Sequence, residues 1–427
     1  MVKPATAAAN RGPASHLFST PLFCLLSLLI TLVFSGTLAA AEKPKVRAVT
    51  AFVRLEPANY QEQVREALTM LRRAKAAFEQ VGYEVQSVRI ATQPFPEYTR
   101  GMTREAALAF LREYDALAKR EGFDASIGPA MLEDGDDPAA VELLHDLFTG
   151  EGVLNASLTV AGEDGVRWKA VGEAAKLIHY WAHHDPSGLA NFGFAATALV
   201  PPNTPFFPAA YHRGPGREFA LALQSANVVA EAFAGVAEFA QARQRLAEAL
   251  GAHAVAIERV ALGIEKESGW GYRGIDLSPA PLKEVSIGGA VEKLTGAPFG
   301  SSGTMTAAAL ITEVLRSLPV KRAGYSGLMV PVLEDTVLAQ RWSDGTLTLD
   351  AVLAYSAVCG TGLDTIPLPG DTTVEQLERI IGDMASLAVK LRKPLSARLM
   401  PIAGKKAGDR TEFNDPYLTN AVIQQLR

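Results

Sequence analysis

Short apolar runs and amphipathic stretches alternate along the chain from Lys45 onward. Residues 46–53 form an apolar run rich in β-branched side chains, which predicts a strand. Residues 61–81 carry apolar side chains on one helical face, and Gly82 ends the predicted helix. Residues 83–90 alternate between two sets of side chains, as in a strand that is partly covered on both faces. The chain is therefore expected to open with a βαβ unit.

The same alternation continues to the C-terminus. Further strands are predicted at residues 125–130, 153–160, 191–200, 219–223, 275–277, 328–333 and 395–402, and a short apolar strand follows Gly362 and closes on Pro367 and Pro369. Further helices are predicted at residues 103–121, 138–150, 163–182, 226–267, 287–294, 305–318, 348–356 and 372–391. About ten strands that alternate with helices favour an α/β barrel or a large doubly wound sheet. No linker is long or biased enough to divide residues 42–427, so we expect a single domain.

Two of these helices carry more specific predictions. The long Ala-rich stretch 226–267 contains Gly251, where we expect the helix to break or bend. Thr372 and Glu375 have the spacing of a capping box, which predicts the start of the helix that reaches Leu391.

Residues 1–41 differ from the rest of the chain. Basic residues precede an apolar run at 22–34, and Ala39 and Ala41 have the spacing of an A-x-A cleavage signal. This pattern predicts a secretory signal peptide, so we expect an exported protein that begins near Glu42. The alternative is an uncleaved membrane anchor, because flanking small residues can extend an apolar run that is shorter than the roughly 20 residues needed to span a bilayer.

Composition narrows the classes of function. The chain of 427 residues is 48% apolar and 20% charged, which is enough to bury a large core. Its formal net charge is −5, and its Lys and Arg residues are scattered singly. Because phosphate backbones are bound by clustered basic side chains, we expect no nucleic acid partner. We also expect no membrane contact after signal cleavage, while association into homo-oligomers stays open.

The stretch 353–370 is the one around which we expect a site. It contains Cys359, and because Cys24 leaves with the signal, the mature chain would have no internal disulfide. Gly360 and Gly362 free the backbone after the thiol, so we expect Cys359 in a tight turn between packed elements. A cysteine in such a place is either a reactive thiol or a small core residue.

Four motifs resemble an uncharacterised bacterial and archaeal family, domain of unknown function 711. They are FFPAAYH at 206–212, GLMVPVLED at 327–335, VCGTGLD at 358–364 and KPLSARL at 393–399. The resemblance covers essentially the whole mature chain. It implies the fold of the pyruvate formate-lyase-like proteins, which is a closed α/β barrel of about ten strands with outer helices and an inserted finger loop.

This resemblance also bears on chemistry. In the glycyl-radical enzymes of that barrel the finger loop presents a cysteine, and Cys359 corresponds to it by position. Those enzymes also need a glycine radical in a C-terminal loop of the Arg-Val-x-Gly-Tyr type, whereas this chain has FNDPYLTN at 413–420. We therefore reject radical chemistry and expect no cofactor.

A candidate anion-binding loop precedes the predicted helix 305–318. Ser301, Ser302 and Thr304 place hydroxyl groups at the helix N-terminus, where free backbone N–H groups attract anions. The alternative is that Ser302 or Thr304 only caps the helix.

Arg398 is the charged residue of the last predicted strand. It shares a face with Ser396 and Met400, opposite an apolar set that we expect against the outer helices. Arg398 would then point into the barrel, where an unpaired guanidinium is costly. It is expected to meet a carboxylate, either from a ligand or from Asp364 or Glu334.

Other candidate ligand-binding residues lie where predicted strands end. Glu334 and Asp335 follow the strand 328–333, and Asp276 and Ser278 lie at the end of another. α/β folds place ligand-contacting groups at the carboxyl ends of strands. Because adjacent strand residues point to opposite faces, Glu334 and Asp335 are not expected to serve one site, and Asp335 is equally suited to cap a helix.

Histidines provide the remaining candidates. His212 follows a rigid Pro-containing run at the entrance of a strand, where a general base would be useful. His179 and His183 have the i, i+4 spacing of a helical metal pair, but the sequence offers no evident third ligand. We interpret them as the polar last turn of a helix and predict no metal site.

These residues predict a central cavity that holds a small anionic or polar ligand near Cys359, His212 and Arg398. Two classes of function stay open. The first is an enzyme of the hydrolase or lyase type, with Cys359 as nucleophile and His212 as base. The second is a non-catalytic binding protein in which Arg398 and the hydroxyl loop hold a carboxylate.

Overall fold

The computed structural model describes residues 42–148 and 152–426. The predicted signal segment 1–41 lies outside the described residues, as do residues 149–151 and 427. Over the described residues the chain forms one mixed sheet of ten strands together with twelve α-helices and a short 3-10 helix. The fold class is therefore α/β, as the alternating pattern predicts.

The ten strands are short and mostly buried. They are β1 Lys45–Val53, β2 Val85–Thr92, β3 Asp124–Pro129, β4 Leu154–Gly162, β5 Gly165–Val166, β6 Phe194–Ala198, β7 Glu218–Gln224, β8 Gly271–Asp276, β9 Gly362–Pro369 and β10 Leu395–Ile402. Every residue of β6, β7 and β10 is buried, as expected for strands that are covered on both faces.

The sheet runs in the order β8-β7-β1-β2-β3-β4-β6-β10-β9, with β5 added to β4. Most neighbours are parallel, including the central series from β1 to β6. Antiparallel pairing occurs where β1 meets β7, where β6 meets β10 and where β5 meets β4. The strand ladders end at β8 and β9, so hydrogen bonds between strands do not close the sheet into a barrel.

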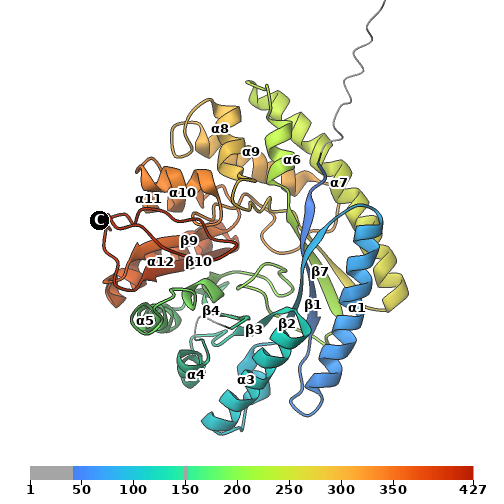
Figure 1. Cartoon of the computed structure of the whole chain (residues 1–427), viewed down its shortest axis with the longest axis vertical. Coiled ribbons are helices and arrows are strands. Elements are labelled where there is room, and N and C mark those ends of the chain that lie inside the picture. Colours follow the sequence, from blue (N-terminus) through green and yellow to red (C-terminus); the bar gives the residue numbers. More distant parts are fainter. Residues whose placement is uncertain (1–41, 149–151, 427) are drawn as a thin grey trace, which may run out of the picture. The chain divides into compact units, whose positions relative to one another are not determined.

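The helices lie outside the strands, which are nearer the centre (Figure 1). They are α1 Tyr60–Gln80, α2 Phe95–Thr99, α3 Arg104–Glu121, α4 Ala139–Leu147, α5 Trp168–His184, α6 Ala226–Ala232, α7 Phe239–Ser268, α8 Ile287–Thr295, α9 Thr304–Ser317, α10 Thr336–Ser343, α11 Leu349–Tyr355 and α12 Val374–Leu391, with the 3-10 helix η1 at Asn191–Gly193. None of the helices in this described part of the chain is both long enough and apolar enough to cross a membrane.

One irregular stretch, residues 321–334, contacts both edge strands, and we call it the linking segment. At its start, the N–H of Ile275 in β8 donates to the Lys321 carbonyl at 2.9 Å, and the N–H of Ala323 donates back to the Ile275 carbonyl at 2.9 Å. Near its end, the Val332 N–H donates to the Asp364 carbonyl of β9 at 3.0 Å. The linking segment therefore bridges the two ends of the strand order without forming a strand.

Local sequence signals set several helix ends. The Thr103 hydroxyl accepts a hydrogen bond from the Ala106 N–H at the start of α3, and Gly122 ends that helix with a φ of 72°. The Thr348 hydroxyl accepts from the Ala351 N–H at the start of α11. Thr103 and Thr348 are the first residues of two predicted helices, and each hydroxyl satisfies an N–H group that has no partner within the helix.

Three predicted elements differ from the structure, one entirely and two in part. Residues 328–333 form no strand, because Pro331 has no N–H to donate and makes only an isolated bridge with Asp364. Helix α7 continues through Gly251, and the interruption comes earlier, between α6 and α7, where Gly235 has a φ of 66°. The stretch predicted as a helix from residue 163 begins with β5, which pairs with β4 before α5 starts.

Two smaller differences concern the start of α12 and the presence of α10. The capping box of α12 is formed by Thr373 and Gln376, one residue after the predicted pair Thr372 and Glu375. Helix α10 was not predicted from the sequence. It begins directly after Asp335, whose side chain accepts the N–H groups of Val337 and Leu338.

Candidate functional site

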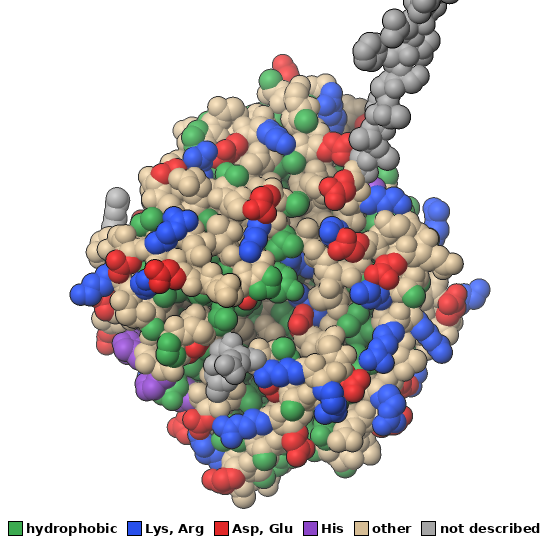
Figure 2. Space-filling view, viewed as in Figure 1, with side chains coloured by type: hydrophobic (Ala, Val, Ile, Leu, Met, Phe, Trp, Pro, Cys, Tyr) green, Lys and Arg blue, Asp and Glu red, His purple; other side chains and the backbone are tan. Residues whose placement is uncertain are grey.

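A cavity of about 340 Å³ lies among the strands and the linking segment. Its charged side chains come from distant parts of the chain. The basic ones are Arg47 on β1, Arg89 on β2 and Arg398 on β10, and the acidic ones are Asp115 on α3, Asp124 on β3, Glu334 at the end of the linking segment, Asp364 on β9 and Asp415 near the C-terminus. Figure 2 shows the molecule hollowed near the middle of the view, where hydrophobic, basic and acidic side chains meet. The volume is within the range of small-molecule sites.

Three arginines of the cavity each lie over an aromatic ring. The guanidinium carbon of Arg398 is 4.8 Å from the ring centre of Phe192, and that of Arg89 is 4.9 Å from the ring centre of Phe207. The corresponding distance from Arg47 to Tyr417 is 5.8 Å. Such stacking stabilises a guanidinium and fixes its plane.

Arg398 pairs with two carboxylates inside the cavity. Its Nε donates to Oδ1 of Asp364 at 2.7 Å, and its Nη2 donates to Oε1 of Glu334. The other oxygen of Glu334, Oε2, accepts from Nη2 of Arg47 at 3.0 Å. Glu334 therefore joins two arginines. Arg398 was expected to meet a carboxylate of a ligand or of the protein, and the protein provides both Asp364 and Glu334.

Burial and pairing shift the pKa values of this network. Burial alone would lower the pKa of Arg398, but Asp364 and Glu334 raise it above its usual value. Burial raises the pKa of Asp364, and the Arg398 charge opposes this rise only in part. Arg398 is therefore a fixed cation, while Asp364 takes up a proton more readily than an ordinary aspartate does.

The guanidinium of Arg89 makes fewer hydrogen bonds to the protein than that of Arg398. Its Nε donates to Oγ of Ser87 at 3.0 Å and lies 3.4 Å from Oδ2 of Asp124, a side chain that is 44% exposed. Its two terminal nitrogens make no hydrogen bond to the described residues, and they are not sealed in the core. Burial lowers the pKa of Arg89, Asp124 raises it and Arg47 lowers it. Arg89 therefore retains hydrogen-bond donors toward the cavity.

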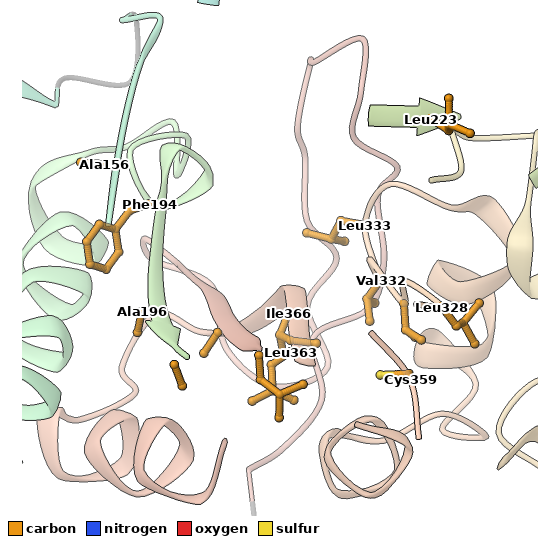
Figure 3. Packing of buried hydrophobic residues seen from close by; sticks show 14 of the residues in the cluster. Ala156, Phe194, Ala196, Leu223, Leu328, Val332, Leu333, Cys359, Leu363 and Ile366 are labelled. Atoms are coloured by element: carbon orange, nitrogen blue, oxygen red, sulfur yellow. The ribbon is translucent and has the colours of Figure 1, made fainter. Parts of the chain in front are cut away.

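Cys359 does not line this cavity. Its side chain is fully buried in the hydrophobic core, on the side of Leu328 and Val332 in Figure 3. Nζ of Lys393 donates to the backbone carbonyls of Ser356 and Cys359, which fixes the turn after α11. The expectation of a tight turn between packed elements agrees with this position.

His212 lies elsewhere, on the loop between β6 and β7. Its side chain is fully buried, with Nδ1 3.2 Å from Oδ1 of Asn203 and 3.5 Å from Oε2 of Glu218. Burial lowers its pKa, and the backbone of Gly214 opposes this in part. Within the described residues no hydrogen bond joins His212 to Cys359, and His212 does not line the cavity either. The structure thus does not bring the expected nucleophile and base together at the cavity.

Asp276 and Ser278 form a junction at the end of β8. Asp276 is fully buried and accepts the N–H groups of Tyr325 and Ser326, at 2.7 and 3.0 Å, together with the N–H and hydroxyl of Ser278. The Ser278 oxygen in turn accepts the N–H of Gly327 at 3.1 Å. Burial raises the pKa of Asp276, which these hydrogen bonds oppose. Both residues hold the linking segment in place and lie outside the lining of the cavity.

Asp335 has the helix-capping role that the sequence left open. Besides starting α10, it accepts the N–H groups of Ile287 and Gly288 and the hydroxyl of Ser286, at the start of α8. Glu334 points instead to the arginines of the cavity. The two neighbours therefore serve different regions, as expected, although no strand precedes them.

The hydroxyl loop before α9 is not part of the cavity. Thr304 is buried, and its hydroxyl accepts the N–H of Gly300 at 3.0 Å. Ser302 is exposed and Ser301 is half-buried, and neither side chain caps α9. The hydrogen bond made by Thr304 stabilises the loop internally.

Arg47 and Arg89 are the cavity residues that the sequence reasoning missed. Both lie in strands that were predicted, and a charged side chain within a mostly apolar strand was the available signal. The same signal led to the prediction for Arg398, whereas Arg47 and Arg89 were not predicted as site residues.

No group of three or more His, Cys, Asp or Glu side chains is arranged to hold a metal ion in residues 42–148 and 152–426. The histidines at the end of α5 stack on one another and on Tyr180, with 4.3 Å between the ring centres of His179 and His183. Nδ1 of His183 lies 2.8 Å from the His179 carbonyl, within the same helix. This end of α5 fits the interpretation as a polar last turn.

Comparison with known proteins identifies the family. Residues 38–414 match the profile of the family described as Uncharacterised ACR (DUF711). The chain is 32% identical over 416 residues to a UPF0210 protein of Pyrobaculum arsenaticum, with 90% of each chain covered. It is 29% identical over 404 residues to a UPF0210 protein of Methanopyrus kandleri, with 86% of this chain and 88% of the relative covered. The chain therefore belongs to the uncharacterised DUF711 family.

Proposed function

We propose that this protein binds a small molecule that carries an anionic group, and that the cavity around Arg89 and Arg398 is the binding site. The observation that carries the proposal is the small number of hydrogen bonds that Arg89 makes. Its two terminal nitrogens have no hydrogen-bond partner among the described residues, although its side chain is only 12% exposed. These nitrogens are open to the cavity, so an anion there can accept charge-assisted hydrogen bonds from them.

The ion pairs of the three cavity arginines support the same proposal. Glu334 and Asp364 neutralise two of the three arginines through direct ion pairs. The remaining guanidinium, Arg89, has only a longer contact to a half-exposed Asp124. An anionic ligand would therefore find one positive charge that no buried carboxylate neutralises.

Arg47 adds donors beside Arg89. Only its Nη2 is used, in the ion pair with Glu334, so its Nη1 and Nε make no hydrogen bond to the described residues. β1 and β2 are neighbouring parallel strands, and the Arg47 charge acts on Arg89. An anion shared between the two side chains would relieve their mutual repulsion.

The enzyme alternative has less support. A thiol nucleophile has to reach a substrate, whereas Cys359 is fully buried among apolar side chains and is no part of the cavity lining. Acid–base chemistry in the cavity would depend on Asp364, whose pKa is raised by burial. We therefore favour a binding protein and leave thiol catalysis out of the proposal.

Calorimetric titration of the purified protein with a series of small monocarboxylates and with inorganic phosphate, at low salt, tests this function. We expect at least one of these anions to bind, and Arg89→Gln to weaken its binding by about tenfold or more. Arg259→Gln, which changes an exposed arginine on α7, is the control and should bind like the wild type. Unchanged binding by Arg89→Gln would contradict the proposed site, and the lack of any anion binding would contradict the function.

We further propose that the linking segment closes the sheet into a barrel-like enclosure around the cavity. Its hydrogen bonds to β8 and to β9 support this. Hydrogen exchange tests it, because the amides of Ile275 and Val332 should then be protected to a similar extent as those of the central strands. Rapid exchange at both amides would speak against closure.

Export is also proposed, from the pattern of residues 1–41 alone. N-terminal sequencing of the protein from its native host is expected to find a start near Glu42. An intact apolar segment at 22–34 would replace export by membrane anchoring.

A further inference from the structure

The cavity contains an unused acceptor as well as unused donors. Asp364 uses Oδ1 to accept from Arg398, and its second oxygen, Oδ2, accepts no hydrogen bond from the described residues. The side chain is 13% exposed, and Oδ2 is not among the buried atoms that are sealed without a partner. Asp364 can therefore accept a hydrogen bond from a molecule in the cavity.

Glu334 cannot take this role. Both of its oxygens are already engaged, Oε1 with Arg398 and Oε2 with Arg47. Glu334 also separates the two ends of the network, with Arg89 and Arg47 on one side and Arg398 and Asp364 on the other. A ligand that satisfies the whole cavity thus needs an acceptor at the Arg89 end and a donor at the Asp364 end.

We propose that the ligand is a small hydroxy acid, whose carboxylate binds Arg89 and Arg47 and whose hydroxyl donates to Oδ2 of Asp364. This inference rests on the proposed binding of an anion at Arg89 and adds the second group that the ligand must carry. One carboxylate matches the single guanidinium that no buried carboxylate neutralises.

A hydroxyl fits the position better than an ammonium group. Arg398 lies directly beside Asp364, so a second cation there would be repelled by the guanidinium. A hydroxyl donates a hydrogen bond to the charged oxygen without this repulsion.

Part of the remaining wall is apolar. Phe206, Met329 and Pro331 line the cavity between the charged groups, and Phe192 and Phe207 lie under the arginines. These walls suit a short hydrocarbon body between the carboxylate and the hydroxyl. The other charged groups of the lining, Asp115, Asp124 and Asp415, are acidic and would repel a second carboxylate.

The test compares acids that share one carbon skeleton. Butyrate, its 2-, 3- and 4-hydroxy derivatives and 2-aminobutyrate are titrated into the purified protein by calorimetry. We expect at least one hydroxybutyrate to bind about tenfold more tightly than butyrate, because its hydroxyl makes a hydrogen bond to a charged group. The three isomers also locate the hydroxyl along the ligand.

Variants separate this inference from the proposed function. Asp364→Ala should remove the preference for the hydroxy acid, so that the hydroxybutyrate and butyrate bind with similar affinity to each other, while Arg398 keeps Glu334. Asp364→Asn, which preserves the shape, should reduce the preference, and it serves if the alanine variant does not fold. Asp371→Ala, at an exposed position after β9, is the control and should keep the full preference.

Each outcome decides between the two proposals. If butyrate binds and no hydroxybutyrate binds more tightly, the hydroxy-acid inference is wrong and anion binding stands. If 2-aminobutyrate binds most tightly, the donor is an ammonium group and the inference is likewise wrong. If none of the acids binds, both the inference and the anion-binding function are wrong.

Discussion

Two regions of this protein bury carboxylates, and the partners of these carboxylates differ. Asp276 and Asp335 accept hydrogen bonds mainly from backbone N–H groups, at the end of β8 and at the starts of α8 and α10. Glu334 and Asp364 are held by arginine side chains that line a cavity. Sequence position does not separate the two kinds, because Glu334 and Asp335 are neighbours.

The difference shows what each kind of partner permits. Backbone N–H groups are fixed by the elements to which they belong, so Asp335 is surrounded by donors and joins two helix starts to one side chain. Arginines have several donors each and can leave some of them unused, as Arg47 and Arg89 do. The first region therefore stabilises the fold, and the second keeps bonding capacity for a ligand.

The largest effect on stability is expected where a buried aspartate accepts backbone N–H groups, at Asp335. Asp335→Ala leaves the N–H groups of Ile287, Gly288 and Leu338 without their acceptor, in buried positions, and removes the cap of α10. We expect the free energy of unfolding to fall by more than about 4 kcal/mol, or the protein not to accumulate in folded form. Urea unfolding measures the change. Asp350→Ala, at an exposed position in α11, is the control and should change it by less than about 0.5 kcal/mol.

A somewhat smaller loss is expected in the cavity. Arg398→Leu leaves Asp364 and one oxygen of Glu334 buried without a counter-charge, which costs on the order of 3–5 kcal/mol. Thermal unfolding checks this against Arg72→Leu, which breaks an exposed pair and should cost at most about 1 kcal/mol. An unchanged melting temperature for Arg398→Leu would mean that the cavity carboxylates are solvated.

The contribution of the cavity carboxylate Asp364 to stability is expected to depend on pH. Burial raises the pKa of Asp364 above 3.8, so the folded protein binds this proton more readily than the unfolded chain does. The contribution of Asp364 to stability is then fully present below its unfolded pKa and is lost as the pH rises through the folded pKa.

Asp364→Asn does not titrate and should lack this loss. The difference in unfolding free energy between the two proteins is therefore expected to move in favour of the variant as the pH rises from about 4. Urea unfolding at a series of pH values measures it, with Asp371→Asn at an exposed position as the control. A shift in the opposite direction would mean that Arg398 lowers the pKa of Asp364 more than burial raises it.

The smallest effect on binding is expected for Cys359. Its thiol lies in the core outside the cavity, so Cys359→Ala should change the affinity for an anion by less than about twofold. In the wild type, iodoacetamide should label the thiol only as fast as the protein opens, so that labelling follows added denaturant. Rapid labelling of the native protein at neutral pH would return Cys359 to the list of reactive groups.

Much of the fold could be predicted from the sequence where one pattern dominates. β10 covers the predicted residues 395–402, and its alternation correctly directs Arg398 away from the outer helices. The linking segment could not be predicted in this way. Its apolar residues resemble a strand, but Pro331 and the contacts to β8 and β9 keep it irregular.

The site was harder to predict than the fold. The last strand and the ends of other strands led to Arg398, Glu334 and Asp364, which do lie together at the cavity. Arg47 and Arg89 were missed because apolar neighbours made their strands look like simple core strands. Cys359 and His212 drew attention by residue type, and residue type does not show whether a side chain faces a cavity or the core.

The linking segment and the last strands also affect when the site can form during synthesis. Arg47 belongs to the first strand, and Glu334 follows it after 287 residues. At a translation rate of about 5–20 residues per second, Glu334 is synthesised roughly 15–60 s after Arg47. Until then the guanidinium of Arg47 has to stay hydrated, which favours an open sheet over a collapsed one. A chain that ends before β9 and β10 therefore has most of the sheet but no complete cavity.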